Sequence, residues 1–300
     1  MTNQNRRPRE SGGPGAKGTV LPFLDSRFCG NDGFLIDALR RHWPEYLIEA
    51  AGLGLFMIMA GVCVMLLEHP RSTLAHAIPN ADLRRALIGV AMGLTAIAII
   101  YSPWGRQSGA HLNPAVTLSF LRLGKVSPAD ALFYVLAQFA GGAAGTLLLA
   151  ALLGRWFTLP PISAVATLPG RPGEVVAFGA EVAIAFVLMS TVLATNASAR
   201  LMRWTGLCAG ALVAIYIAFE APLSGMSLNP ARSVASAVPS GLWRGIWIYL
   251  TAPPIGMLLA AELHARLGRR TPCAKLHHDT DHRCIFHCEF AGTPAREITP

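Results

Sequence analysis

The sequence has few charged residues, and this shortage decides the broad class of protein. Asp, Glu, Lys and Arg together make up 14% of the 300 residues, whereas soluble domains carry about a quarter. Hydrophobic residues make up 53%, and the mean hydropathy is +0.44. Such a composition argues against an ordinary soluble domain and is typical of a protein that crosses a membrane several times.

Signals for secretion and for disulfide bonding are also missing. The first 43 residues are polar and rich in Gly and Pro, without the apolar core of a signal peptide. We expect residues 1–43 to form a disordered cytoplasmic leader, although a start site placed too far upstream would explain the same composition. The six cysteines show no disulfide framework. Cys63 and Cys208 lie inside apolar runs, where cysteine behaves as a small hydrophobe.

Long apolar runs predict six transmembrane helices. Each run is close to the ~20 residues that a helix needs to cross a bilayer. The runs lie at about 45–67, 84–101, 129–153, 175–195, 205–221 and 243–264. Two further apolar segments, at about 113–123 and 229–238, are too short to span and predict re-entrant half-helices.

These elements occur in the same order twice. Repeat one covers residues 44–153 and repeat two covers 175–265, each with three spans and one short segment. Because three is odd, the second repeat enters from the opposite side, as in inverted-repeat proteins whose shared site lies at the bilayer midplane. Glu49 and Glu181 each lie in the first span of a repeat. The prediction is an all-α membrane domain at 44–265, followed by a cytoplasmic tail at 266–300.

Basic residues predict the orientation of the chain. The net charge is +8, and cytoplasmic flanks of membrane spans are enriched in Lys and Arg. With six spans, both termini fall on the cytoplasmic side together with four basic clusters. These are Arg40/Arg41, Arg122/Lys125, Arg200/Arg203 and Arg266/Arg269/Arg270. Some arginines lie in the opposite loops. Nucleic acid is excluded as a partner, because no folded basic surface or binding motif supports it.

Both short segments begin with Asn-Pro-Ala, at Asn113-Pro114-Ala115 and Asn229-Pro230-Ala231. Asn is a favoured N-cap and Pro is tolerated at the first helical position, so each copy predicts a helix start. Half-helices entering from opposite sides would bring their positive N-termini together and repel cations, including hydronium. The asparagine amides would donate hydrogen bonds to a passing water, which then could not relay a proton.

Polar loop residues flank the two motifs. The pore-loop candidates are Gly109, Ala110, His111, Gly225 and Ser227. We expect carbonyls of these loops to form a ladder of hydrogen-bond acceptors, because irregular backbone at membrane depth is tolerated when it lines a wet cavity. Arg232 follows the second motif directly. A charged residue in a membrane region is functional by default, and this one would donate to neutral solutes and repel cations.

The motifs resemble those of the major intrinsic protein family, the aquaporins and aquaglyceroporins. The resemblance covers about residues 44–265 and is closest at Ser-Gly-Ala-His-Leu-Asn-Pro-Ala-Val-Thr (108–117) and Gly-Met-Ser-Leu-Asn-Pro-Ala-Arg-Ser (225–233). It implies a bacterial-type member in the bacterial inner membrane and a homotetramer with one pore per subunit. It also implies passive flow of water and small neutral solutes, no required cofactor, and a structural role for Glu49 and Glu181 beneath the pore loops.

The family's selectivity filter maps to Met92, Ile217, Met226 and Arg232. Ile217 stands where water-selective members carry histidine, and the two aromatics of glycerol facilitators are absent. Two methionines and an isoleucine make the filter apolar and adaptable. The resemblance therefore leaves two solute classes open, a water channel and an aquaglyceroporin-type facilitator of glycerol or other small uncharged solutes.

Cysteine and histidine gather in the predicted tail. Cys273 with His277, and Cys284 with Cys288, have the four-residue spacing that would place both side chains on one helix face. Such a set can supply a tetrahedral zinc site, although no recognised finger spacing is present. The alternative is a disordered tail with exposed thiols. If a metal binds, the tail could gate the inner mouth.

Two other classes of function compete with a channel. An ion-coupled secondary transporter also uses inverted repeats and broken helices, but only Glu49 and Glu181 could serve as its coupling site. A membrane enzyme could use His111, yet no Ser, Cys or Asp partner lies at a recognisable spacing. We therefore predict a channel and not an enzyme.

Overall fold

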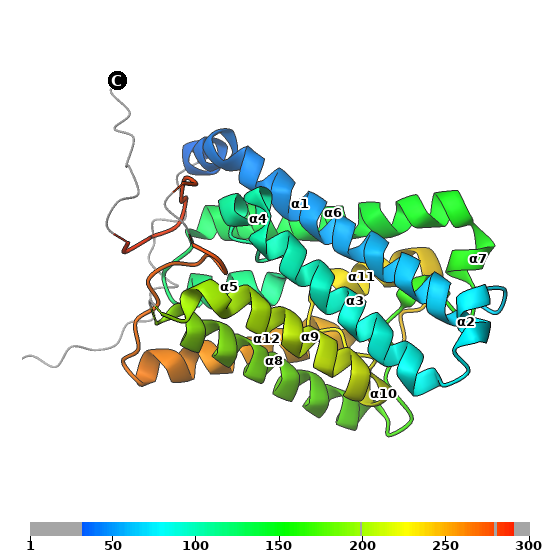
Figure 1. Cartoon of the computed structure of the whole chain (residues 1–300). Coiled ribbons are helices and arrows are strands. Elements are labelled where there is room, and N and C mark those ends of the chain that lie inside the picture. Colours follow the sequence, from blue (N-terminus) through cyan, green and yellow to red (C-terminus); the bar gives the residue numbers. More distant parts are fainter. Residues whose placement is uncertain (1–31, 199, 279–280, 291–300) are drawn as a thin grey trace, which may run out of the picture.

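The computed structural model describes residues 32–198, 200–278 and 281–290, and within these ranges six helices are long and apolar enough to cross a membrane (Figure 1). They are α1 (Asp32–Glu68), α3 (Ala81–Tyr101), α6 (Pro128–Leu153), α8 (Glu174–Asn196), α12 (Ile246–Arg266), and α9 (Thr205–Phe219) taken together with the turn η4 (Met202–Trp204) that precedes it. The predicted all-α membrane fold with six spans is confirmed.

The start of the first helix differs from the expectation. Helix α1 begins at Asp32, so residues 32–43 are helical although they were assigned to the leader. Apolar residues are interspersed with charged ones here, and Arg41 pairs with Asp37 one turn away (2.7 Å), which supports the helix outside the membrane. The rest of the predicted leader, residues 1–31, lies outside the described residues.

The two short apolar segments form helices that are too short to span. Helices α5 (Pro114–Arg122) and α11 (Pro230–Ser240) both begin at the proline of an Asn-Pro-Ala motif. Shorter helical turns connect the main elements. They are α2 (Thr73–Ala77), α4 (Pro103–Ser108), α7 (Arg155–Thr158), η3 (Ser163–Val165), η4 (Met202–Trp204) and α10 (Ala221–Ser224).

Helices of the two repeats pack in corresponding pairs. Helix α1 lies against α6, and α8 lies against α12. Glycine permits the close approach in both pairs: a Cβ at Gly141 would lie 2.0 Å from the Ala50 carbonyl oxygen, and one at Gly256 would lie 2.3 Å from that of Val182. Small residues let membrane helices approach in this way.

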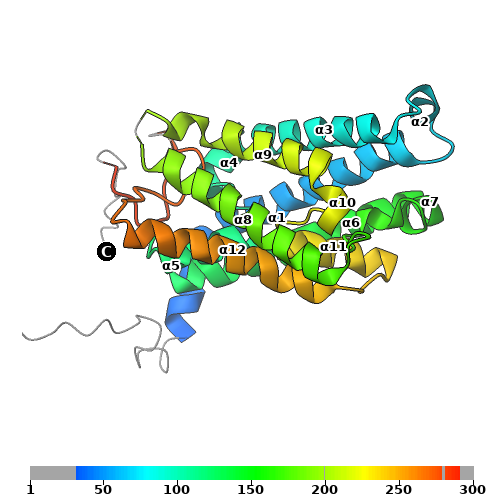
Figure 2. The ribbon, with the colours of Figure 1, turned by 90° about the horizontal axis from the view of Figure 1, so that it is seen from below.

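The chain folds back after α12. Segment 271–290, apart from the two residues 279–280 outside the described ranges, lies across the end of the bundle where α1 begins and α12 ends (Figures 1 and 2). Cys273, Ala274 and Lys275 are fully buried there. The alternative of a disordered tail is therefore wrong for these residues, because they pack against the membrane domain.

Replacing Gly141 by alanine tests the α1–α6 contact. The new methyl group would overlap backbone that cannot rotate away, and overpacking of this kind costs about 1–3 kcal/mol. We expect a lower midpoint for thermal unfolding in detergent. Gly179 is the matched control, because a Cβ there meets nothing within 4 Å. Equal midpoints for Gly141→Ala and Gly179→Ala would contradict the packing described.

Candidate functional site

The two Asn-Pro-Ala motifs start their half-helices in the same way. Asn113 has extended backbone angles, and its Oδ1 accepts a hydrogen bond from the N–H of Ala115 at 2.9 Å. Asn229 is also extended and accepts from the N–H of Ala231 at 3.0 Å. The predicted N-cap role is thus present at both motifs, since the side-chain oxygen satisfies an N–H that the first helical turn leaves open.

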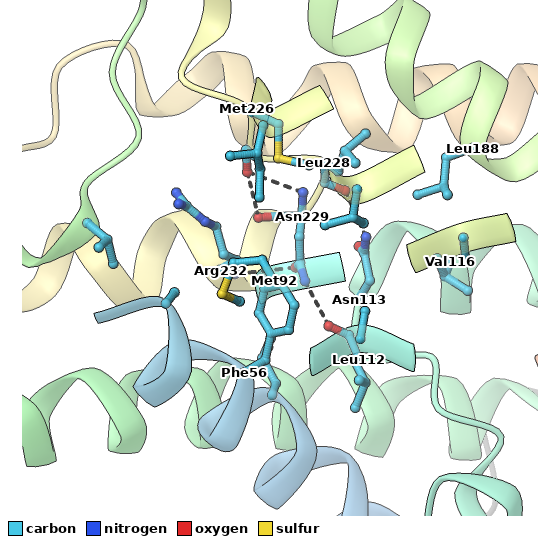
Figure 3. A pocket seen from close by; sticks show the side chains of 18 of the residues that line it. Phe56, Met92, Leu112, Asn113, Val116, Leu188, Met226, Leu228, Asn229 and Arg232 are labelled. Carbon is cyan, nitrogen blue, oxygen red and sulfur yellow. Dashed lines mark hydrogen bonds between the residues drawn. The ribbon is translucent and has the colours of Figure 1, made fainter. Parts of the chain in front are cut away.

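The same two side chains join the half-helices to each other. Nδ2 of Asn113 donates to the Leu228 carbonyl at 2.7 Å, and Nδ2 of Asn229 donates to the Leu112 carbonyl at 2.7 Å (Figure 3). An amide nitrogen carries two N–H groups, so each asparagine keeps one donor beyond this bond. The sequence reasoning assigned both amides to water and missed the reciprocal bond.

Glu49 holds the loop that precedes α5. Its carboxylate is fully buried and accepts from the N–H groups of His111 (3.0 Å) and Leu112 (2.6 Å). The Ser108 hydroxyl and the Gln138 amide also donate to it, at 2.9 and 2.8 Å. A buried carboxylate is costly unless hydrogen bonds satisfy it, and four donors do so here.

Glu181 has the equivalent position beneath the second loop. It is fully buried and accepts from the N–H groups of Ser227 (2.6 Å) and Leu228 (2.8 Å) and from the Ser224 hydroxyl (2.9 Å). The two acids therefore bind matching atoms of the two repeats. Each acid thus anchors the loop that precedes its half-helix, because it accepts the backbone N–H groups of that loop.

A pair of tyrosines strengthens both loops and was missed by sequence reasoning. Tyr134 of α6 donates to the Ser108 carbonyl at 2.7 Å, and Tyr249 of α12 donates to the Ser224 carbonyl at 2.5 Å. Two of the carbonyls bordering the expected acceptor ladder thus already have protein partners. The detectable signal was a tyrosine in the last span of each repeat.

The loops themselves have matching backbone conformations. Gly109 and Gly225 have positive φ angles of 93° and 82°, where glycine is favoured. Ala110 and Met226 follow with φ of 53° and 52°. Left-handed angles at non-glycine residues are costly and persist only when the surroundings enforce them. The Glu, Ser and Tyr contacts above provide that enforcement.

A cavity of about 370 Å³ runs past the junction of the half-helices (Figure 3). Its lining includes every predicted filter and motif asparagine position, namely Met92, Ile217, Met226, Arg232, Asn113 and Asn229. Ala110, His111, Gly225 and Ser227 of the two loops also line it. Sequence-distant residues that were singled out for one site therefore meet around one space.

Arg232 is the cation beside the second motif. Its guanidinium donates to the hydroxyl of Thr167, which lies in the connection between the repeats. None of the ion pairs formed among the described residues involves Arg232. The Arg232 guanidinium is thus positioned by a hydrogen bond to a neutral hydroxyl. Nothing in the sequence around Thr167 marked it as a site residue.

Three of the four predicted metal ligands lie together in one Cys/His cluster. Cys273, Cys284 and Cys288 come together with His278, and their ligand atoms all lie within 4.8 Å of one another. His277 is outside this cluster, and its ring packs against Tyr101 with centroids 4.7 Å apart. The prediction assumed helical spacing, but residues 271–278 are not helical, so the neighbouring histidine faces the cysteines.

Comparisons with known proteins settle the family. A family model described as Major intrinsic protein matches residues 39–264. The chain belongs to the major intrinsic protein family. Aquaporin NIP1-3 of Oryza sativa subsp. japonica is 33% identical over 210 residues, which cover 70% of this chain and 69% of the relative. Aquaporin NIP2-3 of Zea mays is 33% identical over 208 residues, covering 69% and 67%.

A solved structure supports the fold. The aquaglyceroporin from Plasmodium falciparum aligns with a TM-score of 0.61 at 20% identity, over 75% of this chain and 96% of that one. This likeness shows the aquaporin-like fold, and membership of the major intrinsic protein family makes the protein a multi-pass membrane channel and not an enzyme. The relatives named above are plant proteins, so the expectation of a bacterial-type member in a bacterial membrane finds no support among them.

Replacing Glu181 by glutamine tests the loop anchor. Glutamine replaces one of the two accepting oxygens by an NH₂ group, so one backbone N–H of the loop loses its acceptor. An unsatisfied buried donor of this kind costs about 1–3 kcal/mol. The thermal unfolding midpoint in detergent should fall. Glu174→Gln on the same helix is the control, since its carboxylate bonds the exposed Trp247 side chain. A midpoint for Glu181→Gln as high as that of the control would refute the anchoring role.

Proposed function

We propose that this chain forms a passive pore for water and small uncharged solutes, and that the pore excludes protons and ions. The observation that carries the proposal is the junction of two half-helix N-termini on one cavity. Asn113 and Asn229 both line that cavity, and each retains an N–H beyond its bond to the opposite loop.

The charges around the cavity favour neutral solutes. Each half-helix N-terminus carries roughly half a positive charge, and Arg232 adds a full one. Among the described residues that line the cavity, Arg85 and Arg232 are cationic and none is acidic. A cation therefore finds no compensating carboxylate along this path, whereas a water or hydroxyl oxygen finds hydrogen-bond donors.

The filter favours a pore that also admits solutes larger than water. Met92, Ile217 and Met226 present apolar surface, and methionine side chains adapt their shape readily. With Arg232 as the polar member, the filter suits a molecule with one apolar and one hydroxyl-bearing side. The second candidate function is therefore aquaglyceroporin-type facilitation of glycerol or related uncharged solutes.

The observed contacts disfavour an ion-coupled secondary transporter. Its coupling site would have to include Glu49 or Glu181, and every carboxylate oxygen of these residues already accepts a bond from a pore loop or its support. Binding of a coupling ion there would release the loop that shapes the cavity. A channel needs no such rearrangement.

We also propose a homotetramer with one pore per subunit and both termini in the cytoplasm. The spans expose large apolar side chains, such as Leu152 at 71% and Val175 at 86%, which suit contact with lipid or with neighbouring subunits. Three of the four basic clusters lie at or beyond the ends of helices, and Arg40/Arg41 lie near the start of α1. The inside-positive bias assigns all four to the cytoplasmic side.

Stopped-flow light scattering on proteoliposomes tests the pore and its filter. We expect the wild type to raise water permeability above that of protein-free vesicles. Ile217→His should lower the glycerol-to-water permeability ratio several-fold, because it adds a polar wall and narrows the apolar passage. Ile217→Val, which keeps the wall apolar, should leave the ratio close to wild type.

Arg232→Val completes the comparison. Loss of the fixed cation should raise the passage of uncharged solutes and weaken the exclusion of cations. Wild-type vesicles that pass neither water nor glycerol faster than empty vesicles, both with and without a metal chelator, would exclude the channel. An unchanged ratio in Ile217→His would place the filter elsewhere.

A further inference from the structure

Segment 271–290 contacts the first pore loop directly. Nε2 of His111 donates to the Ala274 carbonyl at 2.9 Å, and the N–H of Leu276 donates to the Gly109 carbonyl at 3.0 Å. Leu276 is 7% exposed and lines the same cavity as Asn113 and Asn229. The segment therefore forms the wall at the end of the pore where α1 begins and α12 ends.

Phe286 adds an aromatic contact to this wall. Its ring stacks on His111, with centroids 5.3 Å apart and an interplanar angle of 9°, and lies edge-on to Tyr134 at 5.9 Å. A Cβ at Gly109 would come within 2.8 Å of the Phe286 ring. The fit between segment and loop is thus close enough that even a methyl group would disturb it.

Other bonds fasten the segment to neighbouring helices. The Asn196 amide at the end of α8 donates to the Cys273 carbonyl at 2.8 Å. The N–H of His287 donates to the Lys125 carbonyl just beyond α5 at 3.0 Å, and the Lys125 ammonium pairs with Glu289. Both ends of the segment are therefore tied to the membrane domain.

The segment has no core of its own. Its described residues form neither helix nor strand, and short irregular segments of this kind usually need a metal or disulfide to hold one shape. The Cys/His cluster lies within this segment, where a bound metal would link its two halves. Cys273 Sγ is 3.5 Å from Cys284 Sγ, and Cys288 Sγ is 3.2 Å from His278 Nε2.

Four donors at these distances suit a closed tetrahedral site. Zn–S bonds are about 2.3 Å and Zn–N bonds about 2.0–2.1 Å, which places the ligand atoms of one ion about 3.5–3.8 Å apart. Three sulfurs and one imidazole form a common structural zinc set. No fifth position is needed, so the ion would have a structural role.

Lys275 gives a second, independent indication. Its side chain is fully buried, and its ammonium donates to the Arg283 carbonyl at 2.8 Å. Among the ion pairs of the described residues none includes Lys275. Buried charges are normally paired. A divalent ion with three thiolates and one neutral imidazole carries a net charge of −1, which would balance this ammonium.

We propose that Cys273, His278, Cys284 and Cys288 bind one Zn²⁺, and that the ion holds segment 271–290 as a plug in the inner end of the pore. Binding converts three thiols to thiolates and releases three protons to solvent, with no change in oxidation state. Loss of the ion frees the segment and opens the pore. The gating part of this inference rests on the proposed channel function.

The metal site is tested by measuring the zinc content of the full-length protein after purification with a thiol reductant and reconstitution with Zn²⁺. We expect about one zinc ion per chain for a single closed site. Replacement by Co²⁺ should give the thiolate charge-transfer absorption of a tetrahedral sulfur site. Cys284→Ser and His278→Ala should lose the ion, whereas His277→Ala and Cys208→Ser should keep it.

The opposite outcomes overturn the site. Wild-type protein that holds no more zinc than Cys284→Ser after removal of loose metal contradicts it. So does a disulfide between Cys273 and Cys284 that persists in the presence of the thiol reductant and prevents metal binding. Loss of zinc from His277→Ala to the same extent as from His278→Ala would contradict the ligand assignment.

The gate is tested by water permeability with and without a zinc chelator on the vesicle interior and exterior. Chelation should raise the permeability of wild type and His277→Ala several-fold. Cys284→Ser should be fast from the start and insensitive to the chelator. Zinc binding without any change in permeability overturns the plug and leaves the metal site. Permeability no greater than that of empty vesicles in every state overturns the channel function itself.

Discussion

Two asparagine side chains hold the centre of this protein, because each caps one half-helix and donates to the loop of the other. The bonds from Asn113 to the Leu228 carbonyl and from Asn229 to the Leu112 carbonyl are both 2.7 Å. They fix two helix N-termini against one cavity, in a position that neither half-helix could hold alone. At membrane depth, the polar groups of an irregular loop need partners within the protein or in a wet cavity, and the asparagine amides supply one such partner to each loop. The distance between the two positive helix ends therefore depends on this one reciprocal contact.

The buried acids and tyrosines make the contact possible. Glu49 and Glu181 bind the N–H groups that the irregular loops leave open, and Tyr134 and Tyr249 bind a carbonyl of each loop. A loop with left-handed residues at this depth would otherwise carry several unsatisfied polar groups. Because the same donors and acceptors recur in both repeats, the inverted symmetry extends from the order of helices down to individual hydrogen bonds.

Features that depend on local sequence were predictable, and features that depend on remote contacts were not. Apolar runs set the six spans, and Asn followed by Pro set the starts of α5 and α11 to the residue. The helical start at Asp32 was missed because composition alone assigned a polar stretch to the leader. Thr167 was missed because its role depends on the path of the connection between the two repeats, which brings its hydroxyl to the Arg232 guanidinium. His277 was chosen over His278 because the tail was given helical spacing, whereas the path of segment 271–290 follows from the packing of its Phe286 against His111 and Tyr134.

The central claim is that the paired asparagines let water pass and stop protons. The direct measurement is proton influx, followed with a pH-sensitive dye enclosed in proteoliposomes, alongside water permeability of the same vesicles. The full-length protein is used in whichever metal state passes more water. We predict fast water flow with proton influx no greater than in empty vesicles, and a rise in proton influx for Asn229→Asp, which replaces a donor by an acceptor at the positive helix ends. Proton influx that rises with water flow in the wild type would contradict the account.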